Sequence, residues 1–555
     1  MEATMAGTED RISDFPDEIL HQILSFLPIK AATQTTVLSR RWKHILDSYP
    51  VVDFSQSSIF GLRYEYIQSQ LDSDFSRKEW PQYWETFEKF TKIVDDKLQK
   101  LCEYGIGIQK FKLSIALVDP EFDSFFDEWM DVVSEKHVRE LDLLIMVGGG
   151  GCYVLPETIF ASKCLTVLKI SGFNLTLVHP VTVDLHSLRT LTLKGVYLDE
   201  DMLQNLISGC PLVEDLCLSF RRELMGDSCV PFPFRIKMVN ICGLFKLANL
   251  TIGMLSPGLV PTIKLSRCQD LRRVSLHQVN LKFCVFNDVN FPQIEFISLS
   301  NITFNEVCKI SSYRLKTLII DGCRREEEKL NIFAPNLISV EHTYLVHYSI
   351  LGFFKFLADL NADCNLKVCL YYVNGNLHIP WYIGLKEHLQ KQKQTKTLEV
   401  FFGHPCEIVF DWEEAEKSNC LLPPHALNCL VLKCMSLKIL SCLDFNAVMD
   451  SFFWCCRPQV LSTHTQPRRF IKFLFKTLKN RENEGCCSSS EIKCWRHEGC
   501  CGSSEIKCWR HSLKKVSDVV IFEYKGIEEK MPLCWDTFKK TAPENWAIRS
   551  EESQN

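Results

Sequence analysis

The sequence predicts a mixed α/β protein in three parts: a small three-helix domain, a repeat solenoid with a parallel curved sheet, and a small α/β C-terminal region. Three observations predict this fold. A helix-spaced apolar stripe occurs within the N-terminal segment, a strand pattern then returns about every 20 to 35 residues, and strand-like segments beyond it break that regularity. Because 555 residues exceed what one compact core holds, an elongated array with atypical ends fits the length.

The composition is that of an ordinary globular protein, with 46% apolar and 24% charged residues. A net charge of -5 provides no global field that would favour nucleic acid or a membrane, so neither is expected as a partner. No uncharged apolar run reaches the roughly 18 residues that span a bilayer. The start, MEATMAGTED, lacks the features of a secretory signal, which predicts a cytoplasmic or nuclear protein. The 27 cysteines are therefore expected mostly as free, buried thiols.

The first helix of the N-terminal domain is predicted from its start signals and its apolar spacing. Asp14 is expected to cap it, Pro16 lies in its first turn, and Asp17 and Glu18 suit the positive end of the helix dipole. Its apolar residues form a continuous stripe that Pro28 ends. The stripe consists of Ile19, Leu20, Ile23, Leu24 and Leu27.

Two further helices complete the predicted domain, which covers 11–50. The second is predicted over 31–36, and the third begins near Ser39 and carries Trp42, Ile45 and Leu46 on one side. About forty residues cannot bury this much apolar surface internally, because small domains leave a large share of it exposed. We therefore expect a partner to cover the remainder.

Four short motifs in this segment resemble the F-box of plant F-box/LRR proteins: Asp10-Arg11, Phe15-Pro16, Leu27-Pro28-Ile29-Lys30 and Leu38-Ser39-Arg40-Arg41-Trp42. In that family the F-box docks on an SKP-type adaptor, which links it to a cullin scaffold and a ubiquitin-charged conjugating enzyme. The resemblance implies an adaptor-binding surface, and about a third of its residues are expected to hold the helices together instead, with Trp42 serving both purposes. The residues implied are Phe15, Pro16, Ile19, Leu20, Ile23, Leu24, Leu27, Pro28, Val37, Leu38 and Trp42.

From about residue 106 onward, a pattern of apolar, two others, apolar, one other, apolar recurs at the spacing of leucine-rich repeats. A single short strand cannot bury its apolar face, so neighbouring strands are expected to stack in parallel. The segment LPETIFASKCLTVLKISG also resembles the repeat motif of the plant family. We predict a solenoid with its cap over 106–415, preceded by a helical linker over 51–105. The middle apolar positions are Phe111, Leu141, Leu168, Leu191, Leu216, Leu250, Val274, Ile297, Leu318 and Val340.

The variable residues between these positions are expected to line the concave face of the solenoid. They carry both charge signs without a long run of either, so a protein or peptide partner fits better than a nucleic-acid backbone. Most of them are expected to be solvated strand residues, and the sequence does not select those that contact a target. Examples are Arg189, Thr190, Glu214, Asp215, Arg272, Arg273, Glu295, Phe296, Lys316 and Thr317.

The C-terminal part is predicted as an FBD-like region over 416–545, between the solenoid and a tail over 546–555. The segments PPHALNCLVLKCMS and SLKKVSDVVIFEYKG resemble the FBD of the plant family, the second as a strand that ends at Gly526. Before this region, LGFFKFLADL predicts a helix, and LKVCLYYV and KTLEVFF predict strands that extend or cap the array. Within it, PRRFIKFLFKTLKNR predicts a basic amphipathic helix, which we expect to pack on its own domain rather than on a membrane. The first residues, 1–10, are expected to be a disordered tail.

A tandem duplication at 484–511 repeats EGCCSSSEIKCWRH as EGCCGSSEIKCWRH. Cysteine and histidine within reach of one another can bind zinc. Adjacent cysteines seldom both ligate one ion, however, and a surface loop tolerates lengthening at small cost. We favour the lengthened loop and expect no metal or other cofactor.

No catalytic residues can be nominated, because cysteines and histidines are numerous and scattered. The glycine run 148–151 lacks the Lys-Ser/Thr that follows a phosphate-binding loop. The expected function is therefore not enzymatic. The resemblance implies a substrate-recruiting F-box subunit of an SCF-type (SKP-cullin-F-box) ubiquitin-protein ligase, which binds the adaptor through the F-box and an unknown target protein through the repeats. The alternative is an F-box/LRR protein-binding module that does not promote degradation.

Overall fold

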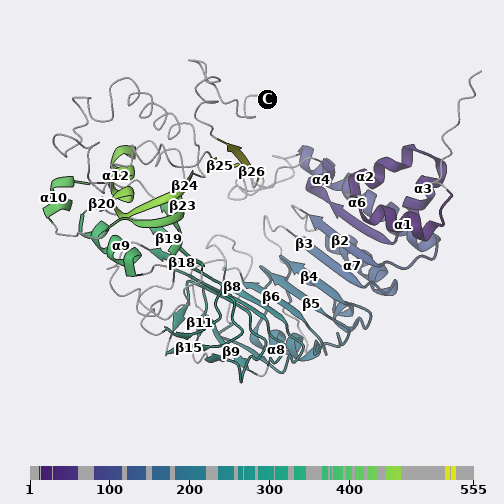
Figure 1. The fold of residues 1–555 in the computed structure, drawn as a ribbon. Helices are drawn as coiled ribbons and strands as arrows, with labels where there is room; N and C mark the ends of the chain where they lie inside the picture. The colour runs from purple at the N-terminus through teal and green to yellow at the C-terminus, as the bar shows by residue number, and fades with distance from the viewer. Residues whose placement is uncertain are drawn as a thin grey trace, which may run out of the picture. The chain divides into compact units, whose positions relative to one another are not determined.

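The computed structural model in Figure 1 describes most of the chain. Several predicted features lie outside the described residues: both tails, the glycine run, the helix at 351–360, the basic helix before residue 482 and the duplicated segment at 484–511. The described residues are 12, 14–27, 29–60, 81–115, 122–145, 153–175, 182–220, 236–254, 261–266, 268–281, 285–304, 307–322, 330–345, 365–372, 376–377, 379–391, 395–402, 407–408, 410–417, 423–434, 444–463, 519–524 and 527–532.

The chain divides into two compact units. The first unit comprises 1–282 and 290–293, and the second comprises 283–289 and 294–555. Each contains a sheet of parallel strands, and the F-box precedes the repeat strands, so the predicted mixed α/β fold class is confirmed. Within the described ranges, no helix is both long and apolar enough to cross a membrane.

The first unit begins with the predicted helices, which are α1 (Asp17–Ser25), α2 (Ile29–Gln34) with the 3₁₀ turn η1 (Thr35–Val37), and α3 (Arg40–Asp47). Ser39 caps α3, since its hydroxyl accepts the backbone N–H of Trp42 at 3.2 Å. The prediction that Asp14 caps α1 is wrong. Pro16 occupies the cap position in an extended conformation and makes no side-chain capping bond, so the helix begins two residues later than a cap at Asp14 requires.

The three helices enclose a small apolar core of their own. Trp42 and Ile45 of α3 pack there with Leu20 and Leu24 of α1, together with Ala32 and Tyr49. The side chains of Ile23, Leu46 and Val51 pack against its edge. The helix-spaced pattern therefore places one side of α1 and one side of α3 in contact with each other.

The main sheet of the first unit is parallel throughout, in the order of its strands along the chain. Its register aligns Phe111, Leu141, Leu168, Leu191 and Leu216, the predicted middle positions, in one buried row that continues through Leu250 and Val274. The predicted repeat strands are thus confirmed here. The strands are β1 (Val51–Ser55), β2 (Lys110–Ile115), β3 (Glu140–Ile145), β4 (Val167–Ser171), β5 (Thr190–Lys194), β6 (Asp215–Phe220), β8 (Asn249–Met254) and β10 (Arg273–His277).

Strand β1 was not predicted, because the sequence indicated a helical linker over 51–105. It pairs with β2 and brings Val52 opposite Phe111 and Phe54 opposite Leu113. The ring of Phe54 lies edge-on to that of Phe90 in α6 (Pro81–Glu103), with 6.3 Å between centroids. The sheet therefore starts directly after the F-box, and α6 occupies much of the rest of this segment.

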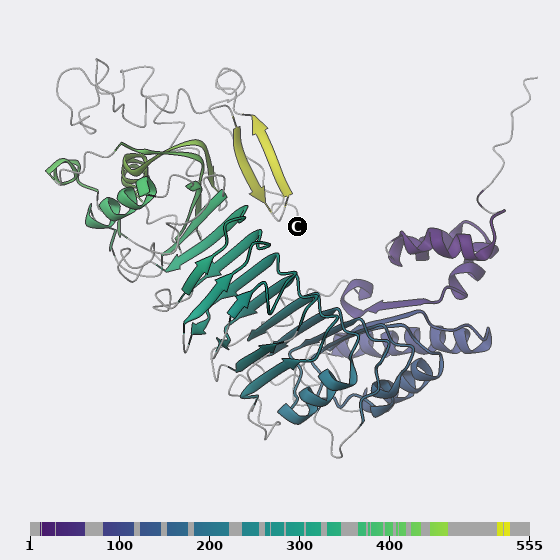
Figure 2. The ribbon, with the colours of Figure 1, turned by 60° about the horizontal axis from the view of Figure 1, so that its bottom comes forward.

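Helices cover one face of this sheet, as Figure 2 shows for α6, α7 (Phe122–Glu135) and α8 (Glu200–Gly209). The short helices α4 (Gln56–Phe60) and η2 (Glu157–Ala161) complete the helical elements of the first unit among the described residues. Farther along, a smaller parallel sheet replaces helices, and its strands are β7 (Met238–Cys242), β9 (Thr262–Ser266) and β11 (Asn280–Leu281). The opposite face of the main sheet is called the open face below.

The chain leaves β4 through a glycine in the left-handed region. Gly172 has φ +82°, and its N–H donates to the carbonyl oxygen of Lys194 at 3.1 Å. A Cβ placed there would lie 2.0 Å from the carbonyl oxygen of Ile145. Both the backbone conformation and the close approach therefore require glycine at this position.

Two lysines of α6 join the F-box to the sheet. The ammonium of Lys97 donates to the carbonyl oxygens of Leu46 and Asp47, at 2.8 and 2.9 Å, at the C-terminal end of α3. Lys100 pairs with the carboxylate of Asp47 at 3.0 Å. These contacts satisfy carbonyl groups that a helix end leaves without an intrahelical partner.

Replacing Lys97 by Met is expected to change the pH dependence of stability in a defined direction. Burial lowers the pKa of Lys97 to about 8, while the charge of Asp47 opposes the shift. The unfolded chain then binds more protons than the folded one between pH 8 and the unfolded value of 10.5, so this group adds stability as pH rises through that window. The free energy of unfolding of the wild type, minus that of the variant, should increase by about 1–2 kcal/mol from pH 7.5 to pH 10.

Urea unfolding of the full chain at several pH values measures this difference. Lys92→Met, at an exposed position of the same helix, is the matched control. The free energy of unfolding of the wild type, minus that of Lys92→Met, should not change with pH. If the free energy of unfolding of the wild type, minus that of Lys97→Met, falls as pH rises, the assigned burial of the Lys97 charge is wrong.

The second unit repeats the same architecture and extends it. Its main sheet is again parallel, and the residues Ile297, Leu318 and Val340 are in register with one another, as predicted for repeat strands. The main strands are β13 (Phe296–Ser300), β16 (Thr317–Asp321), β18 (Ser339–Leu345), β19 (Asn365–Tyr372), β21 (Thr395–Phe402), β23 (His425–Cys434) and β24 (Cys456–Thr463). The other elements are β12 (Val285–Asn287), β14 (Thr303–Phe304), β15 (Cys308–Ser311), β17 (Leu330–Phe333), β20 (Asn376–Leu377), α9 (Ile379–Lys391), β22 (Glu407–Ile408), α10 (Trp412–Lys417), α12 (Phe445–Cys455), β25 (Val519–Tyr524) and β26 (Ile527–Pro532).

The predicted strands at LKVCLYYV, KTLEVFF and 519–526 are present as β19, β21 and β25. The main sheet does not stop at residue 415, where we predicted the end of the solenoid. Strand β23 pairs in parallel with β21, and β24 pairs in parallel with β23. Leu398, Leu430 and Leu461 are in register, so part of the segment predicted as FBD-like continues the repeat sheet.

Candidate functional site

The F-box leaves large apolar side chains exposed to solvent. Phe26 is 80% exposed, Val37 is 85% exposed and Leu38 is 67% exposed. Single exposed apolar residues are normal on protein surfaces, but several within one small domain are typical of an interaction site. The exposed apolar set consists of Ile12, Phe15, Ile19, Phe26, Leu27, Val37 and Leu38.

Helix geometry explains how α1 divides its apolar residues between core and surface. Ile19 and Phe26 are seven residues apart and therefore lie on one side of the helix axis, where both are exposed. Leu20 and Leu24 lie on the other side and are buried against α3. Arg41 of α3 also holds the start of α1, because its guanidinium donates to the carboxylate of Asp17 at 3.1 Å and to the carbonyl oxygen of Phe15.

The structure separates the implied adaptor-binding residues into two groups. Leu20, Leu24 and Trp42 belong to the F-box core, and Ile23 packs at its edge. The exposed members are Phe15, Pro16, Ile19, Leu27, Val37 and Leu38, whereas Pro28 lies outside the described residues. Ile12 and Phe26 are exposed as well and were missed by the sequence reasoning. Phe26 had a usable signal, since it continues the Ile19 and Ile23 side of the stripe.

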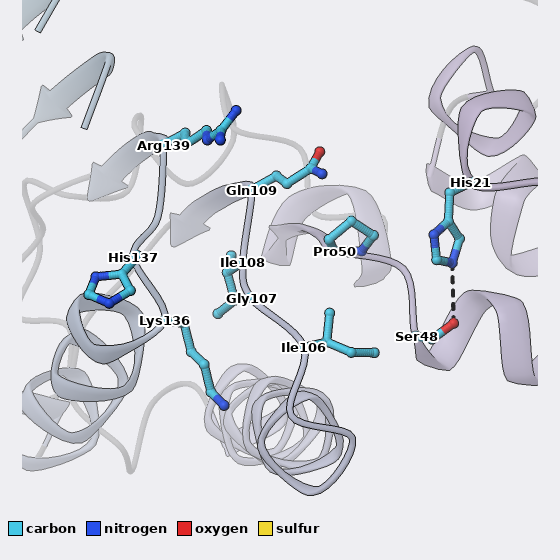
Figure 3. A pocket seen from close by; sticks show the side chains of 10 residues that line it. All are labelled: His21, Ser48, Pro50, Ile106, Gly107, Ile108, Gln109, Lys136, His137 and Arg139. Atoms are coloured by element: carbon cyan, nitrogen blue, oxygen red, sulfur yellow. Dashed lines mark hydrogen bonds between the residues drawn. The ribbon is translucent and has the colours of Figure 1, made fainter. Parts of the chain in front are cut away.

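A pocket of about 430 Å³ lies between the F-box and the loops that precede β2 and β3 (Figure 3). Ser48 and Pro50 line the F-box side, and the ring of His21 is held by the hydroxyl of Ser48, 3.2 Å from Nε2. The ionisable lining residues are all basic: His21, Lys136, His137 and Arg139. Figure 3 shows Arg139 and Lys136 pointing in different directions, so these groups do not converge on one point.

The open face of the first unit carries a ladder of charges across its first strands. Asp53, Lys112, Asp142 and Lys169 occupy directly opposed positions of β1, β2, β3 and β4. The ammonium of Lys112 lies 3.3 Å from the carboxylate of Asp53. Beside this row, Lys110 of β2 pairs with Glu140 of β3 at 3.3 Å. Neighbouring strands thus satisfy much of the charge on this part of the open face.

Several residues that were predicted to line the concave face also pair with each other. Arg189 forms an ion pair with Glu214, and Asp215 accepts a hydrogen bond from the side chain of Asn249. In the second unit, Lys316 pairs with Glu295 at 3.2 Å. These exposed pairs contribute little to stability, but they reduce the charge available to a ligand.

Buried cysteines behave as apolar residues of the core. Cys210, Cys268, Cys308, Cys455 and Cys456 are free and buried. Burial raises the pKa of Cys210 to about 12, and burial together with the nearby Cys242 raises that of Cys268 to about 12. These two thiols are therefore protonated at neutral pH, which makes them poor nucleophiles and poor metal ligands.

Comparison with known proteins agrees with this arrangement. An F-box domain model matches residues 12–53, and a model of the LRR repeats of the FBD-associated F-box protein At5g56370 matches residues 126–231. The putative F-box/LRR-repeat protein At4g00320 of Arabidopsis thaliana is 29% identical over 405 residues, which are 67% of this chain and 73% of that protein. The FBD-associated F-box protein At4g10400 of the same plant is 31% identical over 226 residues, 40% of this chain and 49% of its own length.

A third relative, the putative F-box/LRR-repeat protein At5g41840 of Arabidopsis thaliana, is 33% identical over 38% of this chain and 37% of its own length. The match thus spans half or less of the length of two of these three relatives. The fold and the exposed apolar set define a protein with an F-box joined to leucine-rich repeats. The chain carries an F-box and leucine-rich repeats that are similar to those of F-box/LRR proteins of Arabidopsis, which confirms the resemblance noted in its sequence.

Proposed function

We propose that this chain is the substrate-recruiting F-box subunit of an SCF-type ubiquitin-protein ligase. The observation that carries the proposal is the exposed apolar set of the F-box, which leaves Phe26, Val37 and Leu38 largely in solvent. An SKP-type adaptor would bury these side chains, and the cullin scaffold and the charged conjugating enzyme would join through that adaptor. Burying apolar area at a rate of about 25 cal/mol per Å² favours such docking.

The proposed adaptor surface is narrower than the set implied by the sequence. It consists of the exposed members of that set, together with Ile12 and Phe26. Leu20, Leu24 and Trp42 act indirectly, because they hold α1 and α3 in the geometry that presents the surface. The contact is of the helix-in-groove type, in which apolar anchors of one partner enter a groove of the other.

The repeat strands would supply the second binding function, for a target protein. In this role the chain performs no chemical step itself. It raises the effective concentration of a target lysine near the charged conjugating enzyme, which converts an encounter between two molecules into a reaction within one assembly. The free, buried thiols fit a reducing compartment, so we place this activity in the cytoplasm or the nucleus.

The double variant Val37→Asp, Leu38→Asp is expected to lose binding to an SKP-type adaptor. Both side chains are exposed in the isolated chain, so the fold should survive, whereas two carboxylates at an apolar contact remain unpaired after docking. We expect an affinity loss of about 100-fold or more, measured by titration of the purified full chain with the adaptor.

Val154→Asp provides the control, since Val154 is another exposed apolar residue of the first unit outside the F-box. It should bind the adaptor like the wild type. Equal adaptor affinity of the double variant and the wild type would disprove the proposed surface. If the adaptor binds but depletion of the chain changes the turnover of none of its bound partners, the alternative of a binding module without degradation is correct.

A further inference from the structure

The open face of the first unit changes character along the sheet. The charge ladder ends at β4, and β5, β6, β8 and β10 present mostly small polar side chains. We call the open face of β4 to β10 the polar half. One row across it consists of Lys169, Thr192, Cys217, Thr251 and Ser275, and the next row consists of Ser171, Lys194, Ser219, Gly253 and His277.

The polar half carries an excess of positive charge, although the chain as a whole has a net charge of -5. Lys169, Lys194 and Arg273 are all exposed. In the described part of the chain, Lys169 and Lys194 form no ion pair, in contrast to Lys110 and Lys112 of the charge ladder. One acidic residue, Asp215, occupies these five strands on the open face, and its carboxylate already accepts the amide of Asn249.

Hydroxyl groups lie on both sides of Lys194 and on the β5 side of Lys169, whose β3 neighbour is Asp142. Thr192 lies directly opposite Lys169, and Ser219 lies directly opposite Lys194. Thr251 and Ser275 continue the first row on β8 and β10. Lysine ammonium and hydroxyl groups are both donors that suit carboxylate oxygens, and charge-assisted bonds of this kind are stronger than neutral ones.

The dimensions suit an extended segment of chain. Five strands at a spacing of about 4.8 Å give the polar half a width of roughly 19 Å. An extended peptide of about six residues covers that distance. Phe, Tyr and Trp side chains, on which nucleic-acid bases stack best, are absent from the open face of these strands as described, and His277 is the one aromatic ring there, so a peptide fits better than a single-stranded nucleic acid.

We infer that the polar half binds an extended, acidic segment of the target protein, with Lys169 and Lys194 contacting its Asp or Glu carboxylates. This inference rests on the proposed function, because it specifies the target class of the same repeat surface. Charge complementarity selects the occupant: the lysines of β2 are paired with carboxylates of the neighbouring strands, whereas Lys169 and Lys194 form no ion pair among the described residues and have charge available for a ligand.

The test is a fluorescence anisotropy titration of the full chain in complex with its adaptor. The probe is a short fluorescein-labelled peptide of alternating Glu and Ser, and a peptide of alternating Lys and Ser is the comparison. We expect the acidic peptide to bind, with an affinity that falls as salt is added. The double variant Lys169→Glu, Lys194→Glu should weaken this binding about tenfold or more.

Lys264→Glu is the matched control, because Lys264 is an exposed lysine of β9 in the smaller sheet of the same unit. It should bind the acidic peptide like the wild type. Undiminished binding of the acidic peptide by the Lys169→Glu, Lys194→Glu variant would overturn the inference. So would equal losses in that variant and in Lys264→Glu, or stronger binding of a single-stranded oligonucleotide than of the acidic peptide.

The adaptor titration separates this inference from the function on which it rests. Both lysines are remote in sequence from the exposed apolar set, so the Lys169→Glu, Lys194→Glu variant should keep its adaptor affinity. Normal adaptor binding with no binding of the acidic peptide refutes the inference and leaves the adaptor role intact. Loss of adaptor binding by Val37→Asp, Leu38→Asp with retained peptide binding supports both assignments.

Discussion

Replacing Gly172 by alanine is expected to destabilise the first unit by about 4 kcal/mol or more, a magnitude that few single substitutions reach. The left-handed conformation of this residue, with φ +82°, alone costs a residue with a Cβ about 1–2 kcal/mol. The new Cβ would also lie 2.0 Å from the carbonyl oxygen of Ile145, and neither backbone can move without breaking strand pairing between β3 and β4.

Gly243→Ala separates these two contributions. Gly243 also has a positive φ, of +95°, but a Cβ there would meet nothing within 4 Å. This variant should lose about 1–2 kcal/mol from backbone strain alone. Thermal unfolding of the full chain, with hydrogen exchange of the β3, β4 and β5 amides, measures both effects. Similar losses in the two variants would show that the approach to Ile145 is not a constraint.

Trp42→Ala is expected to cost about 3–5 kcal/mol of F-box stability, because it removes the largest side chain of the F-box core. Trp42 is 7% exposed and packs with Leu20, Leu24 and Ile45. Adaptor binding should also fall, but through loss of the helix arrangement. Hydrogen exchange of α1 and α3 in the full chain should increase by several orders of magnitude relative to the wild type.

The comparison with Val37→Asp, Leu38→Asp identifies the role of Trp42. The surface variant should lose adaptor affinity with unchanged hydrogen exchange in the F-box, whereas Trp42→Ala should change both. The outcome that contradicts a core role is a Trp42→Ala protein with wild-type exchange rates that fails to bind the adaptor. Such a result would place Trp42 at the interface itself.

Local patterns predicted most of the secondary structure that positions these sites. The repeat strands from β2 to β18 follow the recurring apolar spacing, because strands stacked in register must each present the same side to a common core. The helices of the F-box follow from the spacing of Ile19, Ile23 and Leu27 and from the cap at Ser39. Such signals depend on residues that are close in sequence.

The elements that were missed lack this local signal. β1 lies outside the regular spacing, separated from β2 by the long helix α6, and it becomes a strand because β2 pairs with it. β23 and β24 follow segments that interrupt the spacing, and their place in the sheet is visible only from their pairing with β21 and with each other. The burial of Lys386 beneath the ring of Trp454, 3.9 Å from its centroid, likewise depends on packing between α9 and α12.

By itself, the sequence determined that this protein has an apolar three-helix F-box followed by stacked repeat strands, since both follow from short-range periodicity. Only the tertiary structure decided which apolar residues of the F-box are exposed. Leu24 and Phe26 have similar hydrophobicity and lie two positions apart, yet α3 covers the first and leaves the second in solvent. The tertiary structure also decided which lysines of the open face are paired, because an ion pair requires a carboxylate on the neighbouring strand, about 30 to 60 residues away in the chain.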